Sequence, residues 1–235
     1  MGNLTKANLC KFRPLRPLSV LLLLLMSFCF QTASAQVIDQ NVAAHETSFK
    51  SQIFSMEDLQ GLLAKNSIVR GDFAQSRTMS MFKQPLLSKG HFVLSKDNGL
   101  LWRQTQPFSV FLTLTQNKLK QQFANQTPQL MSAKDNPMVF YFSHLFLSLF
   151  QGNTQALTLQ FDLLLTGNKN HWQLNLTPKE APLNQVFSSI QLAGSDYINS
   201  LLLTENRGDK TSIIFTNQRS LPTSLTVEEQ REFNI

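Results

Sequence analysis

Two long blocks of the chain alternate apolar and polar residues with a period of two, and this alternation limits the possible folds strongly. The first block runs from Ile68 to Phe123 and the second from Ala156 to Gln218. Side chains of a β-strand point alternately to opposite faces, so the pattern predicts strands that each have one apolar face. Short strands at regular spacing, separated by turn sequences such as "GNKN" and "NRGDK", predict antiparallel meanders.

The predicted strands can be placed by their sequences. In the first block they are "IVRGDFAQSR", with Val69, Gly71, Phe73 and Gln75 on one face, then "GHFVLSK", "LLWRQTQP", "FSVFLTLT" and "NKLKQQF". In the second they are "ALTLQFDLLLTG", with Leu157, Leu159, Phe161, Leu163 and Leu165 on one face, then "HWQLNLTP", "NQVFSSIQLAG", "YINSLLLTEN" and "KTSIIFTNQ". Pro107 fits a strand end, because proline cannot donate a hydrogen bond within a sheet.

Between the blocks lies "PMVFYFSHLFLSLF", residues 137–150, which is apolar almost all round. Asn136 is suited to cap a helix, Pro137 to its first position, and Gly152 to end it. Fourteen residues are too few to cross a bilayer, so such a helix must be covered by protein or meet another apolar surface. A second helix is expected over residues 55–65, with Ser55 as its cap, and the last ten residues are expected to form a short helix or a tail. The expected fold is therefore α+β with one curved antiparallel sheet.

The first 35 residues have the pattern of a cleaved secretory signal. Four basic residues precede the apolar run "LSVLLLLLMSFCF", and "ASA" at residues 33–35 supplies the small residues of a cleavage site. We expect cleavage after Ala35, a flexible arm over residues 36–52, a single domain over residues 53–235, and localisation in a bacterial periplasm.

Cleavage would change the composition. Both cysteines, Cys10 and Cys29, would be removed, which excludes a disulfide framework and a thiol nucleophile. The remaining 17 basic and 15 acidic residues give a balance of +2, so charge does not support nucleic-acid binding.

No catalytic or metal-binding motif stands out. The chain lacks a Gly-x-Ser-x-Gly elbow, a His-Glu-x-x-His pair and the glycine loops of nucleotide-binding proteins. His45, His91, His144 and His171 are scattered, without the spacing of metal ligands. We expect no enzyme activity, no metal and no cofactor. A secreted esterase that uses Ser143, Ser148 and His144 is kept as a weaker alternative.

Phenylalanine is the most distinctive component. Sixteen of the 19 phenylalanines would remain after cleavage, against two tyrosines and two tryptophans. Phenylalanine has no polar group, so this bias suits a hydrocarbon environment. An apolar helix over the hollow of a curved sheet would enclose a pocket for acyl chains.

Three segments resemble the periplasmic outer-membrane lipoprotein carrier family, LolA. They are "VRGDFAQSR", with its Phe-x-Gln at residues 73–75, "SKGHFVLSKDNGLLWRQTQP", with Trp102 and Gln106-Pro107, and "HWQLNLTPKEAPLNQV", with Leu-Thr-Pro-Lys at residues 176–179. The resemblance covers most of residues 54–218 and suggests a divergent member.

The resemblance implies a fold and a function. The fold would be an unclosed antiparallel barrel covered by helices, and the segment 137–150 would be part of a lid over the cargo. The function would be to shield the acyl chains of lipoproteins between an inner-membrane ABC exporter and an outer-membrane receptor. The family commonly has an arginine that pins the lid, and Lys96 stands at the matching position. Lysine offers a point charge in place of a planar fork, so its lid-gating contacts must differ.

The lipid-binding lining is predicted from strand phase and from the helix. It comprises Phe73, Phe92, Leu94, Trp102, Phe111, Phe140, Phe142, Leu145, Phe146, Phe150, Phe161, Trp172 and Leu174. A slip of one residue in a strand would reverse its faces. The cargo is expected to be an acylated lipoprotein, bound by a monomer. A glycolipid or another acylated envelope molecule is the alternative cargo, and a structural envelope protein with a filled core is a further alternative.

Overall fold

The computed structural model describes residues 54–151 and 153–235. The predicted signal peptide and the predicted arm, with His45, lie outside the described residues. In chain order the elements are α2 (Met56–Leu63), β1 (Ile68–Thr78), β2 (Leu86–Ser95), β3 (Gly99–Gln106), β4 (Val110–Leu114), β5 (Lys118–Phe123), β6 (Gln129–Ser132), α3 (Pro137–Gln151), α4 (Thr154–Gln160), β7 (Phe161–Asn168), β8 (His171–Pro178), α5 (Leu183–Val186), β9 (Phe187–Gly194), β10 (Ile198–Glu205), β11 (Lys210–Arg219) and α6 (Val227–Phe233).

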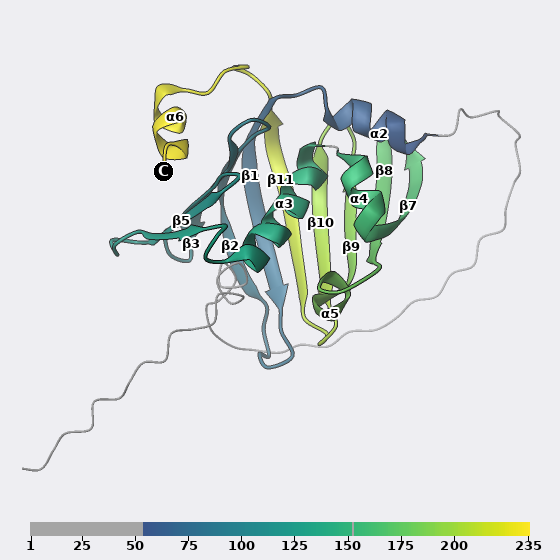
Figure 1. Ribbon diagram of the computed structural model, residues 1–235, viewed down its shortest axis with the longest axis horizontal. Helices are drawn as coiled ribbons and strands as arrows, with labels where there is room; N and C mark the ends of the chain where they lie inside the picture. The colour runs from purple at the N-terminus through teal and green to yellow at the C-terminus, as the bar shows by residue number, and fades with distance from the viewer. Residues whose placement is uncertain (1–53, 152) are drawn as a thin grey trace, which may run out of the picture.

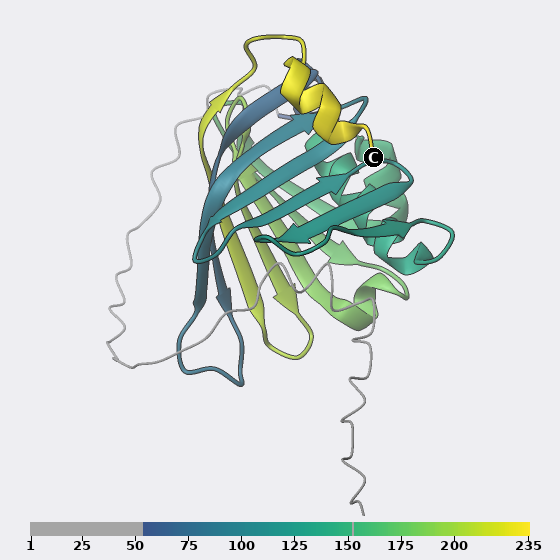
Figure 2. The ribbon, with the colours of Figure 1, turned by 90° about the vertical axis from the view of Figure 1, so that its left-hand side faces the viewer.

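The strands of the described part form one antiparallel sheet of eleven strands, in the order β6-β5-β4-β3-β2-β1-β11-β10-β9-β8-β7. The two meanders meet where β1 pairs with β11, and β6 and β7 are the unpaired edges. The sheet is strongly curved, with α3 and α4 in its hollow and α6 on its outside (Figures 1 and 2). This confirms the predicted α+β class and the unclosed antiparallel barrel covered by helices.

The helix boundaries follow from local sequence. Ser55 caps α2, accepting a hydrogen bond from the Asp58 backbone N–H, while the Asp58 side chain accepts one from the Ser55 N–H. This reciprocal capping box satisfies two backbone donors that the first turn leaves free. Helix α3 begins at Pro137, as predicted. The last residues form a helix, α6, which has the same type of capping box between Thr226 and Glu229.

Three boundaries differ from the sequence prediction. Residues 156–160 belong to α4 and not to the strand that follows, so Leu157 is buried and Leu159 is 73% exposed although the pattern placed them on one face. Two leucines two residues apart fit either a strand or a short helix. Residues 184–186 lie in α5 before β9 starts. Residues 129–132, predicted to lie outside the strands, form the edge strand β6 because they pair with β5.

Candidate lipid-binding site

Aromatic side chains gather on the concave face of the sheet. The ring of Phe73 on β1 stacks on Trp102 of β3, with ring centroids 3.6 Å apart and planes inclined by 22°. Phe215 of β11 meets Phe92 of β2 edge to face at 5.3 Å. Offset stacks and edge-to-face contacts are the favoured geometries of aromatic pairs. These rings belong to one buried cluster that extends across most strands of the sheet.

Two glycines make room for this packing. A Cβ at Gly71 of β1 would lie 2.8 Å from the Phe92 ring, and a Cβ at Gly194 of β9 would lie 2.6 Å from the Trp172 ring. Both distances are too short for carbon atoms, so glycine lets each ring lie close to the neighbouring backbone. The indole N–H of Trp172 donates to the Ser195 carbonyl at 2.7 Å, which satisfies the only polar atom of that side chain.

Helices α3 and α4, which we call the lid helices, cover this cluster. Their buried side chains include Val139, Phe140 and Leu147 on α3 and Leu157 on α4. The Tyr141 hydroxyl donates to Gln160 Oε1 at 2.7 Å and so joins the two helices. Partial burial raises the pKa of the Tyr141 hydroxyl.

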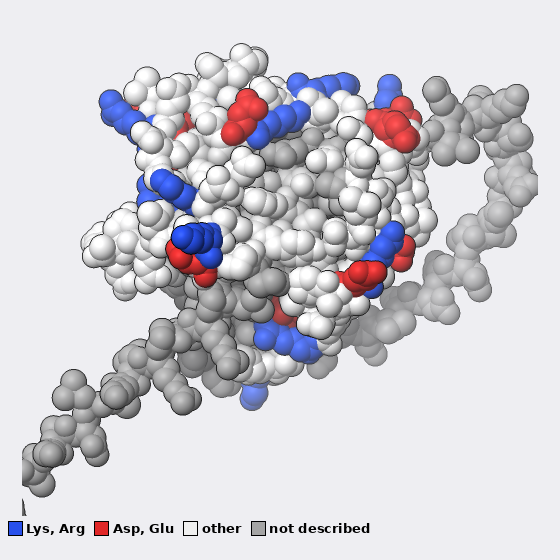
Figure 3. Space-filling model, in the orientation of Figure 1, with Lys and Arg blue, Asp and Glu red and all other residues white. Residues whose placement is uncertain are grey.

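The lid helices contain no Lys, Arg, Asp or Glu residue. In Figure 3, which shows the side of the molecule on which they lie, charged side chains are found toward the periphery and the described central area is uncharged. The described helices include none with the length and apolar character needed to cross a membrane.

Two polar contacts attach the helices to the sheet at one end. His144 Nε2 of α3 lies 2.6 Å from the carbonyl of Gln116, in the turn between β4 and β5. The Lys96 ammonium, directly after β2, donates to the carbonyl of Ala64, the C-cap of α2. Partial burial lowers the pKa of Lys96, and the neighbouring Asp97 carboxylate opposes this shift.

A polar hollow of about 280 Å³ lies between these contacts. It is lined by Lys96, Asp97, Asn98, Gly99, Gln116, His144, Leu147 and Ser148. Leu147 also belongs to the buried cluster, so the hollow adjoins the apolar interior. Lys96 thus contacts α2 directly and lies beside α3, while its predicted lid-gating role stays a prediction.

The structure brings most of the predicted lining residues together. The buried cluster contains Phe73, Phe92, Leu94, Trp102, Phe140, Phe161, Trp172 and Leu174, and Leu145 is partly buried against it. The side chains of Phe142, Phe146 and Phe150 lie outside the described part of the structure. Whether any of these residues binds lipid stays a prediction.

The predicted position of Phe111 is wrong. It pairs with Arg103 of β3 and Gln122 of β5 on the outer face, and the Arg103 guanidinium lies 5.2 Å from its ring centroid. Val110, Leu112 and Leu114 face inward instead, and Phe111 shares the outer face with Thr113. The alternation indicated this phase, and the one aromatic residue on the mostly polar face led to the wrong assignment. Phe215 was missed as a lining residue, although its alternation with Ile213 marked it as part of an apolar face.

The residues of the esterase alternative have other partners. The Ser143 hydroxyl donates to the Val139 carbonyl and the Ser148 hydroxyl to the His144 carbonyl, each at 2.8 Å within α3. Such back-bonding satisfies hydroxyl groups inside a helix. The described residues contain no group of three or more His, Cys, Asp or Glu side chains that could hold a metal ion.

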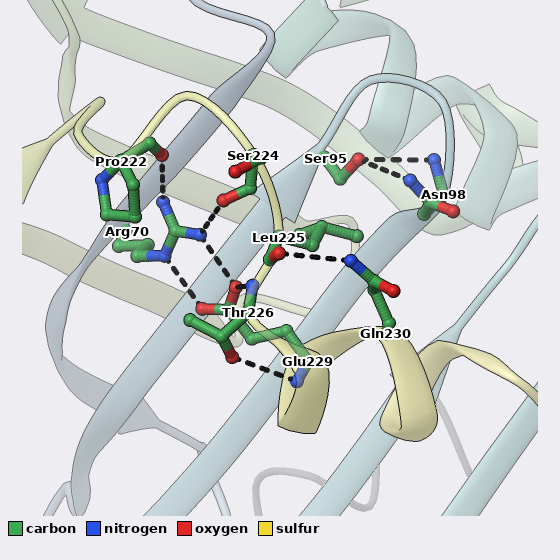
Figure 4. Close-up of polar contacts among 9 residues, drawn as sticks. All are labelled: Arg70, Ser95, Asn98, Pro222, Ser224, Leu225, Thr226, Glu229 and Gln230. Atoms are coloured by element: carbon green, nitrogen blue, oxygen red, sulfur yellow. Dashed lines mark hydrogen bonds and ion pairs between the residues drawn. The ribbon is translucent and has the colours of Figure 1, made fainter.

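The outer face carries the C-terminal segment, residues 220–235, and the Arg70 guanidinium makes four of the contacts that hold it. Arg70 of β1 donates to both carboxylate oxygens of Glu229, at 2.7 and 2.6 Å, and to the carbonyls of Pro222 and Ser224, at 2.7 and 2.9 Å (Figure 4). Glu229 also accepts from the Thr226 N–H at 2.8 Å, which completes the cap of α6. Arg103 pairs with Glu232 further along the helix. Phe233 is buried on this face.

The fold and its interior define a class of protein: an open antiparallel barrel with uncharged lid helices over an aromatic concave face. Residues 52–216 match the model of the family described as outer membrane lipoprotein carrier protein LolA-like. Because this match covers well over half of the chain, the chain belongs to the LolA-like family, which is a family of carriers and not of enzymes. The C-terminal segment lies beyond the matched residues.

Two solved structures are similar to the chain at low sequence identity. A DUF1329 family protein from Desulfovibrio piger shares 12% identity, with a TM-score of 0.42, over 73% of this chain and 93% of that one. A LolA superfamily protein from Nitrosomonas europaea shares 9% identity, with a TM-score of 0.40, over 71% of this chain and 93% of that one. No curated protein matches the chain.

Proposed function

We propose that this protein is a periplasmic carrier that shields the acyl chains of lipoproteins during transfer from the inner to the outer membrane. The observation that carries the proposal is the aromatic concave face covered by lid helices without a charged residue. Membership of the LolA-like family supports the same function. The lining consists of the predicted residues of the buried cluster, with Phe142, Phe146 and Phe150 of α3 as further members.

The strength of hydrocarbon burial explains why such a carrier needs a lid. Burying one methylene group contributes about 0.8 kcal/mol, so one sixteen-carbon chain could contribute roughly 12 kcal/mol. Complete burial of several chains would make release very slow. Lid helices reduce the net binding free energy. Before the cargo can bind, the lid must open and separate apolar surfaces that were already buried, and only then do the lid helices pack against the cargo.

The proposal also covers the export of the protein and the transfer of its cargo. The signal peptide over residues 1–35 would direct export, residues 36–52 would form a flexible arm, and residues 53–235 would act as one monomeric lipid-carrier domain. Cargo would come from an inner-membrane ABC exporter and pass to an outer-membrane receptor. The uncharged lid side supports this path, because an apolar chain can leave there without passing a charged group.

Native mass spectrometry with lipid extraction tests the function. The mature protein would be purified gently from its own periplasm. Co-purifying acylated lipoprotein is the expected result. A protein that carries no lipid and binds no apolar dye in its native state would contradict the carrier function and favour a filled structural core.

A different acylated cargo, such as a glycolipid, is the second candidate. Lys96 supports it, because a lysine ammonium, which donates to the Ala64 carbonyl, stands where the family commonly has an arginine. The same lipid extraction separates the two cargoes. An acyl-ester hydrolysis assay on the protein and on variants of Ser143, Ser148 and His144 tests the esterase alternative, for which we expect no activity.

A further inference from the structure

Gln121 of β5 is a polar residue in the apolar interior. Its side chain is on the concave face, because it pairs directly with Leu112 of β4, and Leu112 pairs with Trp102 of β3. Residues directly opposite each other in antiparallel strands share a face. Gln121 is 1% exposed, Leu112 is 2% exposed and Leu119, two residues earlier on the same strand, is 0% exposed.

The amide group of Gln121 has no hydrogen-bond partner among the described residues, at either its Nε2 or its Oε1 atom. Two other buried glutamines of this sheet do have partners. Gln75 Nε2 donates to the Ser88 hydroxyl at 3.2 Å, and Gln104 Nε2 donates to the Phe108 carbonyl at 3.1 Å. A buried amide that lacks both a donor partner and an acceptor partner is costly and rare in native proteins, so it calls for an explanation.

We propose that Gln121 recognises the amide linkage at the head of an acyl chain, so that the protein selects N-acylated ligands. This inference rests on the proposed function, because it assigns the polar group of a ligand whose chain lies in the same interior. A secondary amide offers one C=O acceptor for Nε2 and one N–H donor for Oε1, so it satisfies both unpaired atoms together.

Other chain heads fit less well. An ester has a carbonyl oxygen for Nε2 but no hydrogen for Oε1, so one atom of Gln121 stays unpaired. A fatty acid is ionised near neutral pH, and its carboxylate would carry a charge into an apolar interior, which is strongly unfavourable. The geometry therefore favours the amide over both.

Two ligands of equal chain length test the assignment: N-methylpalmitamide and methyl palmitate. Their dissociation constants would be measured for the mature protein by displacement of an apolar fluorescent dye. One additional buried hydrogen bond corresponds to a preference of up to about tenfold, so we expect the amide to bind up to about tenfold more tightly than the ester. In Gln121→Leu the preference should disappear while methyl palmitate still binds.

Gln122→Leu is the matched control, because Gln122 is the next residue on β5, pairs with Phe111 on the outer face and donates to the Gln126 carbonyl. This variant should keep the amide preference. An equal affinity of the wild-type protein for the two ligands, or an unchanged preference in Gln121→Leu, would overturn the assignment and leave the carrier function intact. Failure of both ligands to bind the wild-type protein would overturn the carrier function and the assignment with it. Circular dichroism of both variants confirms that each is folded.

Discussion

At the scale of single residues, Glu229 shows how one carboxylate can serve two elements. It accepts the fork of the Arg70 guanidinium and also caps the helix in which it lies. The hydrogen bond from Arg70, more than any other contact, holds the pKa of Glu229 below its ordinary value, and partial burial opposes the shift. Hydrogen bonds to a charged group are stronger than those between neutral groups, so this contact contributes more than an exposed ion pair would.

The lowered pKa of Glu229 predicts a particular pH dependence. A carboxyl group whose pKa is lower in the folded than in the unfolded state stabilises the fold at pH values above its unfolded pKa. This contribution is lost as the pH falls through the lowered folded value. Glu229→Gln should therefore reduce the free energy of unfolding by about 2 kcal/mol at pH 7. The difference from wild type should shrink as the pH falls below about 4.3, the ordinary pKa of glutamate.

Urea denaturation between pH 7 and pH 3 measures this difference. Glu228→Gln is the control, because Glu228 is the preceding residue of α6 and is exposed. A difference between Glu229→Gln and wild type that stays constant over this pH range would show that the charge of Glu229 does not stabilise the folded state.

Single residues also show where reading the sequence succeeded. Phe73, Phe92 and Trp102 were assigned to the concave face because polar residues on the other face of their strands marked the phase. Phe111 alternates with Val110, Leu112 and Leu114 and so belongs to the other face of its strand, where it packs outside near Arg103 and Lys120. Gln121 was not singled out at all, since a glutamine in "NKLKQQF" looks like an ordinary exposed strand residue.

At the scale of elements, the position of α3 depends on contacts far apart in the sequence. Asn136, suited to cap a helix, and Pro137 predicted where α3 begins, and the apolar character of the segment predicted that it would be covered. The sheet that it covers, however, is built from strands on both sides of it in the chain. The contact between His144 and Gln116 joins α3 to the β4–β5 turn and holds one edge of the lid.

Removing this contact should loosen the lid. In His144→Ala the Gln116 carbonyl loses its partner in α3, which we expect to cost about 1 kcal/mol of local stability, or roughly a fivefold faster hydrogen exchange of the α3 backbone. Hydrogen–deuterium exchange with mass spectrometry measures this directly. Ser148→Ala is the control, because the Ser148 hydroxyl bonds only within the helix among the contacts described, to the His144 carbonyl. Equal exchange of α3 in His144→Ala and in the wild-type protein would contradict a holding role for His144.

At the scale of the whole molecule, a carrier and a structural protein with a filled core differ in whether their interior binds an apolar ligand. Leu145 of α3 is partly buried against the concave cluster, so a charge there would have to enter the space where a chain is proposed to lie. Leu145→Glu should weaken the binding of an apolar fluorescent dye by at least about tenfold, because a carboxylate is strongly disfavoured beside hydrocarbon.

Dye titration of the folded protein at neutral pH provides the measurement. Gln155→Glu on α4 is the control, because that residue is exposed and the substitution adds the same charge to a lid helix. Unchanged dye binding in Leu145→Glu would place the binding surface elsewhere.

Local sequence alone determined the strands, their approximate spacing, the start of α3 and the cap of α2, because alternation and capping residues act over a few positions. It also determined that the interior would be rich in phenylalanine. The tertiary structure decided that residues 156–160 form a helix and that residues 129–132 pair as an edge strand. It also decided that Arg70 holds the C-terminal segment. Each of these depends on contacts with another element, and the pattern of neighbouring residues does not specify which partner a side chain or strand will meet.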